Sequence, residues 1–69
     1  MPAPKLDWSD VREIAIALES AHPEVEILKL RFTELHRMVT LLPGFAGDPQ
    51  ASSEKLLESI QMTWLDERD

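Results

Sequence analysis

The sequence contains no cysteine and no tyrosine, and its 69 residues include only seven Lys and Arg against thirteen Asp and Glu. The absence of cysteine excludes a disulfide framework, a thiolate zinc site, a cysteine nucleophile and cysteine ligation of a metal cluster. The formal charge of −6 at pH 7 argues against binding to nucleic acid, whose affinity depends on basic side chains, and against binding to an anionic membrane surface.

Long apolar runs and catalytic signatures are also missing. The longest apolar stretches span only a few residues, so we expect no membrane span, and residues 1–5 lack the apolar core of a signal peptide. His22 and His36 do not form a His-x₃-His metal pair, the serines match no nucleophile elbow, and no glycine-rich phosphate loop occurs. Without these signatures we expect that the protein is not an enzyme. The lack of cysteine also fits a reducing compartment, so we expect a cytoplasmic protein.

The length allows one small domain. A chain near this size buries only about 60% of the surface that its unfolded form exposes, which leaves little room for an enclosed small-molecule pocket. A hydrophobic content of 43% is ordinary for a globular domain. We expect residues 1–5, which include two prolines, to form a flexible lead-in, and residues 6–69 to form a single acidic helical domain that is monomeric.

Three segments with helical periodicity predict an all-α fold, a small three-helix bundle. They cover about residues 9–21, about residues 34–42, and a third stretch that opens at Asp48-Pro49 or at Ser52 and runs to about residue 66. The candidate N-cap of the first segment is Asp7 or Ser9, and that of the second segment is Thr33. The intervening residues 24–32 fit either a short extended piece or a helical turn.

The few aromatic side chains divide between the predicted core and one turn. Trp8, Phe32 and Trp64 are expected in the core, since Trp64 lies at helical spacing from Ile60 and Trp8 directly precedes the first helix. Phe45 stands in a turn between Gly44 and Ala46. That position fits either exposure for a partner or folding back to cover the bundle.

Acidic residues concentrate in the two outer parts of the chain. Residues 48–69 hold six acids and two bases, a net −4, residues 1–32 hold six acids and four bases, a net −2, and residues 33–47 are neutral. Asp66, Glu67 and Asp69 crowd the end of the last helix, where the helix dipole disfavours anions. These acids fit either a solvated terminus or a surface for a basic partner or a hard cation.

Several short motifs in a fixed order resemble the IscX family, the small acidic proteins of bacterial iron–sulfur cluster assembly. The matching segments are Leu6-Asp7-Trp8-Ser9-Asp10, Arg12-Glu13-Ile14, Arg31-Phe32-Thr33 with His36, Asp48-Pro49-Gln50-Ala51-Ser52, Glu54-Lys55 and Trp64-Leu65-Asp66-Glu67. The order and spacing agree from about Leu6 to the C-terminus, which is nearly the whole chain. The run that starts at Asp48 and the run that starts at Trp64 are the most specific pieces.

The resemblance implies a helical fold described as a modified winged helix. It also implies an adaptor and regulator that docks on the cysteine desulfurase, modulates sulfur delivery to the scaffold and binds ferrous iron (Fe²⁺) weakly through surface carboxylates. It implies no tightly bound cofactor, and it makes other iron–sulfur assembly proteins further candidate partners. Two other functions stay open: a carrier or sensor of ferrous iron, and a small acidic mimic that occupies a nucleic-acid-binding surface.

Acidic residues stand at the positions where the family carries them: Asp10, Glu13, Glu24, Glu26, Glu34, Asp48, Glu54, Glu58, Asp66 and Glu67. From this set we predict partner binding by Asp10, Glu13, Glu58, Asp66 and Glu67, and weak metal binding by Glu24, Glu26, Asp48, Glu54 and Glu58. The chain departs from the family form in residues 43–47, which hold no acid, and at Ser20 and Leu41. These departures reduce the number of carboxylates available to any cluster, so they affect iron binding more than desulfurase binding.

Overall fold

The computed structural model describes residues 6–69, and the lead-in predicted for residues 1–5 lies outside this range. The regular structure of the described part consists of three α-helices and one short 3₁₀ helix: α1 (Val11–Ala21), η1 (Ile27–Lys29), α2 (Phe32–Thr40) and α3 (Glu54–Arg68). Within residues 6–69 there is no β-strand, only one isolated bridge between Leu6 and Phe45. The predicted all-α fold with three packed helices is therefore confirmed.

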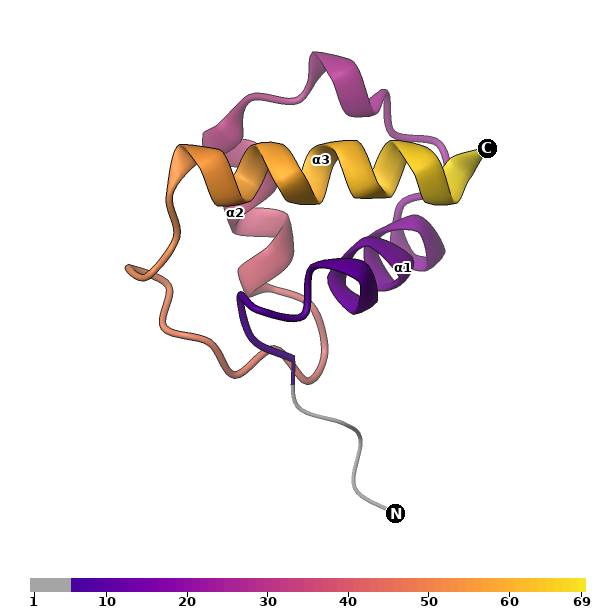
Figure 1. Cartoon of the computed structure of the whole chain (residues 1–69). Helices are drawn as coiled ribbons and strands as arrows, with labels where there is room; N and C mark the ends of the chain where they lie inside the picture. The colour runs from indigo at the N-terminus through magenta and orange to yellow at the C-terminus, as the bar shows by residue number, and fades with distance from the viewer. Residues whose placement is uncertain (1–5) are drawn as a thin grey trace.

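The last helix is the central element of the domain (Figure 1). α1 packs mainly against α3, and both α2 and η1 also contact α3. In Figure 1, η1 runs along one edge of α3 while α1 lies on the other side of it. No helix within residues 6–69 combines the length and the apolar character that a membrane crossing needs.

The core draws apolar side chains from every helix and from the segment before α1. The buried residues are Trp8, Ile14, Ala15, Leu18, Ile27, Leu35, Val39, Leu42, Leu57, Ile60 and Trp64. Burial of one large apolar side chain contributes roughly 1.5–3 kcal/mol to stability. Trp8 and Trp64 lie in the core as predicted, and Phe32 is half-buried against it.

Helix α1 begins at Val11, later than the predicted caps. Asp10 occupies the N-cap position, whereas Asp7 forms a turn before the helix. The Asp7 carboxylate accepts hydrogen bonds from the backbone N–H of Ser9 at 2.8 Å and from the Ser9 hydroxyl at 2.5 Å. Both predicted cap residues are thus bonded to each other, because Asp and Ser side chains compete for nearby backbone groups in turns as readily as at caps.

The other two helices also start away from the predicted positions. α2 begins at Phe32, so Thr33 lies inside its first turn and is not its N-cap. α3 begins at Glu54, where the Ser53 hydroxyl caps the helix by accepting from the Leu56 N–H at 3.2 Å. Asp48 instead stabilises a turn, since its carboxylate accepts from the Gln50 N–H at 2.9 Å. Of the ambiguous residues 24–32, Ile27–Lys29 form a helical turn.

The loop between α2 and α3 is held against the segment before α1 by hydrogen bonds and an aromatic contact. The Trp8 indole N–H donates to the Asp48 carbonyl at 2.6 Å, and the Leu6 N–H donates to the Gly44 carbonyl at 2.9 Å. Phe45 packs edge-on against Trp8 with ring centroids 4.9 Å apart. Phe45 therefore folds back onto the domain, which is one of its two expected placements.

Candidate functional site

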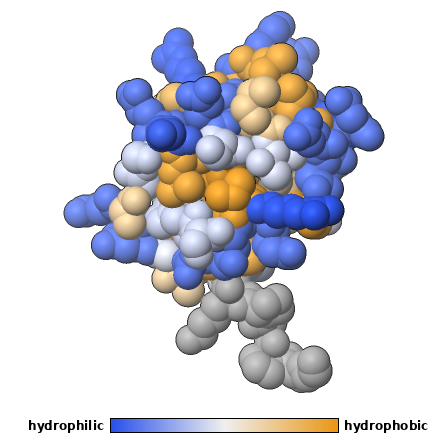
Figure 2. Space-filling view, in the orientation of Figure 1, coloured by the Kyte–Doolittle hydropathy of each residue, from blue (hydrophilic) through white to orange (hydrophobic). Residues whose placement is uncertain are grey.

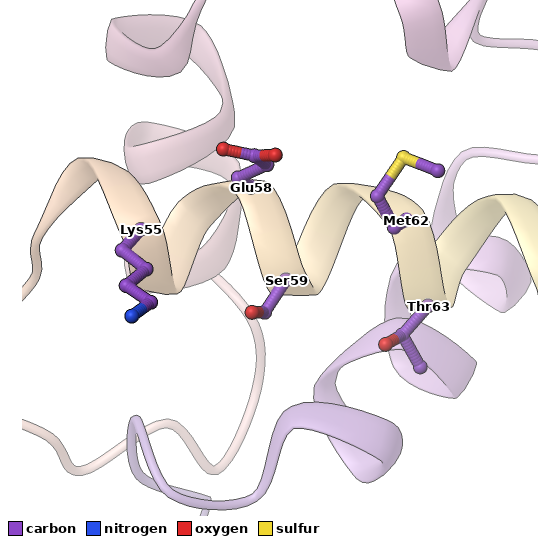
Figure 3. A pocket seen from close by; sticks show the side chains of 5 residues that line it. All are labelled: Lys55, Glu58, Ser59, Met62 and Thr63. Carbon is purple, nitrogen blue, oxygen red and sulfur yellow. The ribbon is translucent and has the colours of Figure 1, made fainter.

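The side of α3 that faces away from the core carries exposed polar side chains around one methionine. Leu57, Ile60 and Trp64 point into the core, and helix residues three or four apart share a face. The opposite stripe, the α3 face, consists of exposed residues: Lys55, Glu58, Ser59, Met62 and Asp66. A shallow hollow of about 380 Å³ lies on this face, and its lining side chains are shown in Figure 3.

Two of the predicted partner-binding acids, Glu58 and Asp66, belong to the α3 face. They are eight residues apart, which corresponds to about 12 Å along a helix, and Met62 lies midway between them. None of the ion pairs within residues 6–69 involves either acid. Their charges are therefore available to solvent or to a partner.

The other three predicted partner-binding acids lie around the contact between the start of α1 and the end of α3. Arg12 Nε lies 3.5 Å from Glu67 Oε1, so the positive charge of this exposed arginine offsets the negative charge of the half-buried Glu67. Asp10 is half-buried and accepts from the Asp7 N–H at 3.1 Å, whereas Glu13 is exposed. The fold thus brings the α1 acids to the same end of α3 as Asp66 and Glu67, while Glu58 lies two turns away.

A charged cluster at the end of α3 was not predicted from the sequence. Arg68 Nη2 donates to Glu19 Oε1 at 2.8 Å and Arg68 Nε to the same oxygen at 3.0 Å, and both side chains are 26% exposed. The Trp64 indole N–H donates to Glu19 Oε1 at 3.2 Å, and the guanidinium lies 5.6 Å from the centre of the Trp64 ring. No local pattern signals this pairing, because 49 residues separate Glu19 from Arg68.

Arg68 also fixes the chain that follows α1. It donates to the carbonyl of His22 at 2.9 Å and to the carbonyl of Val25. The hydrogen bond from Arg68 lowers the pKa of Glu19, and the same contact raises the pKa of Arg68. Both groups therefore stay charged near neutral pH and cancel one another, so neither adds to the field of the surface.

The ion pairs of the described residues leave the net charge of residues 48–69 unchanged at −4, because they engage one base and one acid of this segment. Of the two bases in residues 48–69, Arg68 pairs with Glu19 of α1. Of the six acids in the same range, one, Glu67, pairs with Arg12 among the described residues. One base, Lys55, then stands against five acids: Asp48, Glu54, Glu58, Asp66 and Asp69.

The predicted weak metal ligands are spread over three parts of the fold. Glu24 and Glu26 lie between α1 and η1, Asp48 lies in the α2–α3 loop, and Glu54 and Glu58 lie one turn apart on α3. Glu26 pairs with Lys29 at 3.0 Å. Within residues 6–69 no group of three or more His, Asp or Glu side chains is placed to hold a metal ion. The described residues therefore do not fit a resident iron site with several protein ligands.

A second hollow, of about 340 Å³, lies where α2 and α3 begin, and no local sequence pattern predicts it. It is lined by Phe32, Thr33, His36, Glu54 and Leu57. The His36 ring stacks on Trp8 with centroids 5.6 Å apart, and its Nε2–H donates to the Pro49 carbonyl at 2.5 Å. His36 therefore has a structural role in holding the α2–α3 loop.

Comparison with known proteins finds similarity over nearly the whole chain. A family model described as iron-sulphur cluster assembly matches residues 6–69. An uncharacterized protein of Pseudomonas aeruginosa is 52% identical over 64 residues, which is 93% of this chain and 97% of that protein.

Proposed function

The chain belongs to the iron-sulphur cluster assembly family, the IscX family, and we propose that it acts in this process as a non-enzymatic adaptor and regulator. In this proposal the acidic surface docks on the cysteine desulfurase, and other assembly proteins are further partners. Ferrous iron binds weakly and in exchange with solvent.

The single observation that carries the docking proposal is that the two acids of the α3 face, Glu58 and Asp66, are exposed and form no ion pair with another described residue. Exposed carboxylates attract a basic surface over about 10 Å at 0.1 M salt. Opposite charges across an interface speed association and fix its register. The α3 face therefore supports binding to a basic patch on a protein.

The predicted acids take different roles in this docking. Glu58 and Asp66 contact the partner's basic side chains directly, and Glu13 extends the surface onto α1. Glu67 and Asp10 are partly occupied by Arg12 and by the Asp7 N–H. Their effect on binding is smaller, because a partner must compete with contacts already made within the domain.

The experiment is a titration of the purified cysteine desulfurase with the full chain at about 50 mM and about 300 mM salt. We expect the affinity to fall steeply between the two conditions. Glu58→Lys and Asp66→Lys should each weaken binding about tenfold at low salt and reduce its salt dependence. Both residues are exposed, so the variants should fold.

The matched control is Glu34→Lys, which makes the same change in charge on the exposed first turn of α2. It should keep the affinity within about twofold, because the substitution lies outside the α3 face. An affinity that is independent of salt, or an equal loss in all three variants, would contradict docking through this face.

The alternative function as an iron carrier or sensor has no comparable support. A carrier needs several oxygen ligands around the metal, and the predicted ligands are dispersed over the described part of the fold.

A further inference from the structure

Two exposed apolar side chains lie on neighbouring elements beside the acids of the α3 face. Met62 of α3 is 51% exposed and Leu28 of η1 is 68% exposed. The two elements are in contact, and the Gln61 side-chain amide donates to the Ile27 carbonyl at 2.8 Å. Leu28 and Met62 each follow one of these two hydrogen-bonded residues directly, so both lie near the contact between η1 and α3.

Charged and polar side chains surround this apolar area (Figure 2). In Figure 3, Glu58 and Met62 rise from the same edge of α3, the edge along which η1 runs in Figure 1. Figure 2 shows an apolar area over this part of the molecule with hydrophilic side chains around it.

The spacing along α3 places one apolar side chain between two carboxylates. Glu58, Met62 and Asp66 follow at i, i+4 and i+8, so each acid lies about 6 Å along the helix from Met62. Single exposed apolar residues are ordinary on protein surfaces, but here Leu28 and Met62 lie on two elements in contact, with acids on either side of Met62. In protein interfaces a few desolvated apolar residues contribute most of the affinity, and charges at the rim set the association rate.

We propose that Leu28 and Met62 are the apolar anchor of the docking surface, an inference that rests on the function proposed above. The surface takes a segment with two Lys or Arg about 12 Å apart and an apolar side chain between them. Met62 suits this role because a methionine side chain adapts its shape to a partner.

Charge complementarity selects this occupant over a second copy of the chain. A symmetric dimer through the same face would bring Glu58 and Asp66 of one copy against those of the other. A basic segment instead pairs with both acids while it covers the apolar pair. The docking then has two separable parts: a charged rim that salt screens, and an apolar centre that salt leaves intact.

The test compares Met62→Gln and Leu28→Gln with Asp66→Lys in binding to the cysteine desulfurase at low and high salt. The two Gln variants should each lose about tenfold in affinity at both salt concentrations, with the salt dependence unchanged. Asp66→Lys should reduce the salt dependence. Leu41→Gln is the matched control, since Leu41 is 74% exposed and follows α2, and it should bind as the wild type does.

A second arm uses a synthetic helical peptide with two lysines eight residues apart and a leucine midway, followed by NMR of the full chain. The peptide should shift the amide signals of Leu28 and Met62. If the desulfurase binds with salt dependence but the Gln variants bind normally, the anchor is wrong and the docking proposal stands. If the desulfurase does not bind but the peptide shifts these signals, the proposed function fails and the anchor stands. A peptide that shifts neither signal, or sedimentation showing a dimer through this face, overturns the inference.

Discussion

Arg68 near the end of α3 and Glu19 of α1 form a forked ion pair, in which Nη2 and Nε donate to the same carboxylate oxygen at 2.8 Å and 3.0 Å. The arginine also bonds to the carbonyls of His22 and Val25. It therefore joins three segments at the end of the helix that carries Glu58 and Asp66. The orientation of the α3 face depends on this contact.

Removal of the arginine should destabilise the domain. Arg68→Gln should lower the midpoint of thermal unfolding by several degrees, because Glu19 and two backbone carbonyls each lose a donor. Arg12→Gln is the control, since it removes only the exposed contact with Glu67, and exposed ion pairs contribute little. Circular dichroism of both variants checks this, and equal midpoints for the two would contradict a structural role for Arg68.

Stability should fall in acid through Glu19. The bond from Arg68 holds the Glu19 pKa below its ordinary value of 4.5. The unfolded chain therefore takes up a proton at a higher pH than the folded one. The contribution of Glu19 is present above pH 4.5 and is lost as the pH falls through the lowered pKa.

Glu19→Gln supplies the comparison for this pH effect. The variant should be less stable than the wild type at pH 7, and the difference between their unfolding midpoints should shrink as the pH falls below 4.5. The pKa of Asp7 is also lowered, by its hydrogen bonds with Ser9. Asp7 is present in both proteins, so its contribution to the pH dependence of stability cancels in the comparison. A constant difference across this pH range would show that Glu19 acts by packing alone.

Gly47 should tolerate no larger residue, because it lies against the aromatic contact that holds the α2–α3 loop. A Cβ at this position would lie 2.8 Å from Phe45 Cζ and 3.2 Å from Trp8 Cδ1. Gly47→Ala should therefore reduce the free energy of unfolding by about 1–3 kcal/mol. It should also move the indole N–H signal of Trp8 and leave that of Trp64 in place.

The control for Gly47→Ala is Ala46→Ser, which adds one atom to an exposed neighbour. It should stay within about 0.5 kcal/mol of the wild type in urea unfolding. Unchanged stability and an unchanged Trp8 signal in Gly47→Ala would show that the loop can move away from the ring.

Ferrous iron should bind diffusely. Because the predicted ligands are dispersed, an anaerobic titration should broaden NMR signals near many exposed acids, without saturation at one equivalent of iron. Glu54→Gln with Glu58→Gln should reduce the broadening on α3 and leave it at Glu24 and Glu26. Saturable binding with broadening confined to a few acids would favour the carrier function instead.

Much of the fold follows from local patterns. The spacing of Leu57 and Ile60 with Trp64 predicts both the existence of α3 and the side that it buries. The helix starts were less predictable, since several side chains before each helix are able to cap it. Ser53 caps α3, whereas the Asp48 carboxylate accepts from Gln50 in a turn and the Asp48 carbonyl accepts from Trp8, 40 residues away.

The candidate surface was predicted in part. The acids of α3 stand at positions that the chain alone reveals, and their helical spacing places Glu58 and Asp66 on one face. Their freedom from internal pairing could not be predicted, because it depends on Arg68 bonding to Glu19 and Arg12 lying beside Glu67. Weak metal binding by the predicted acids stays a prediction, since no group of three or more His, Asp or Glu side chains within residues 6–69 is placed to hold a metal ion.

Helical periodicity, the net charge of −6 and the positions of the acids are properties of the chain itself, because each depends only on residue type and on spacing within one segment. Folding decided which charges cancel and which apolar side chains stay exposed beside one another. Glu19 and Arg68 meet across 49 residues, and Leu28 comes to lie near Met62 because η1 packs on α3. Such contacts join segments remote in sequence, so only the packing of the helices determines them.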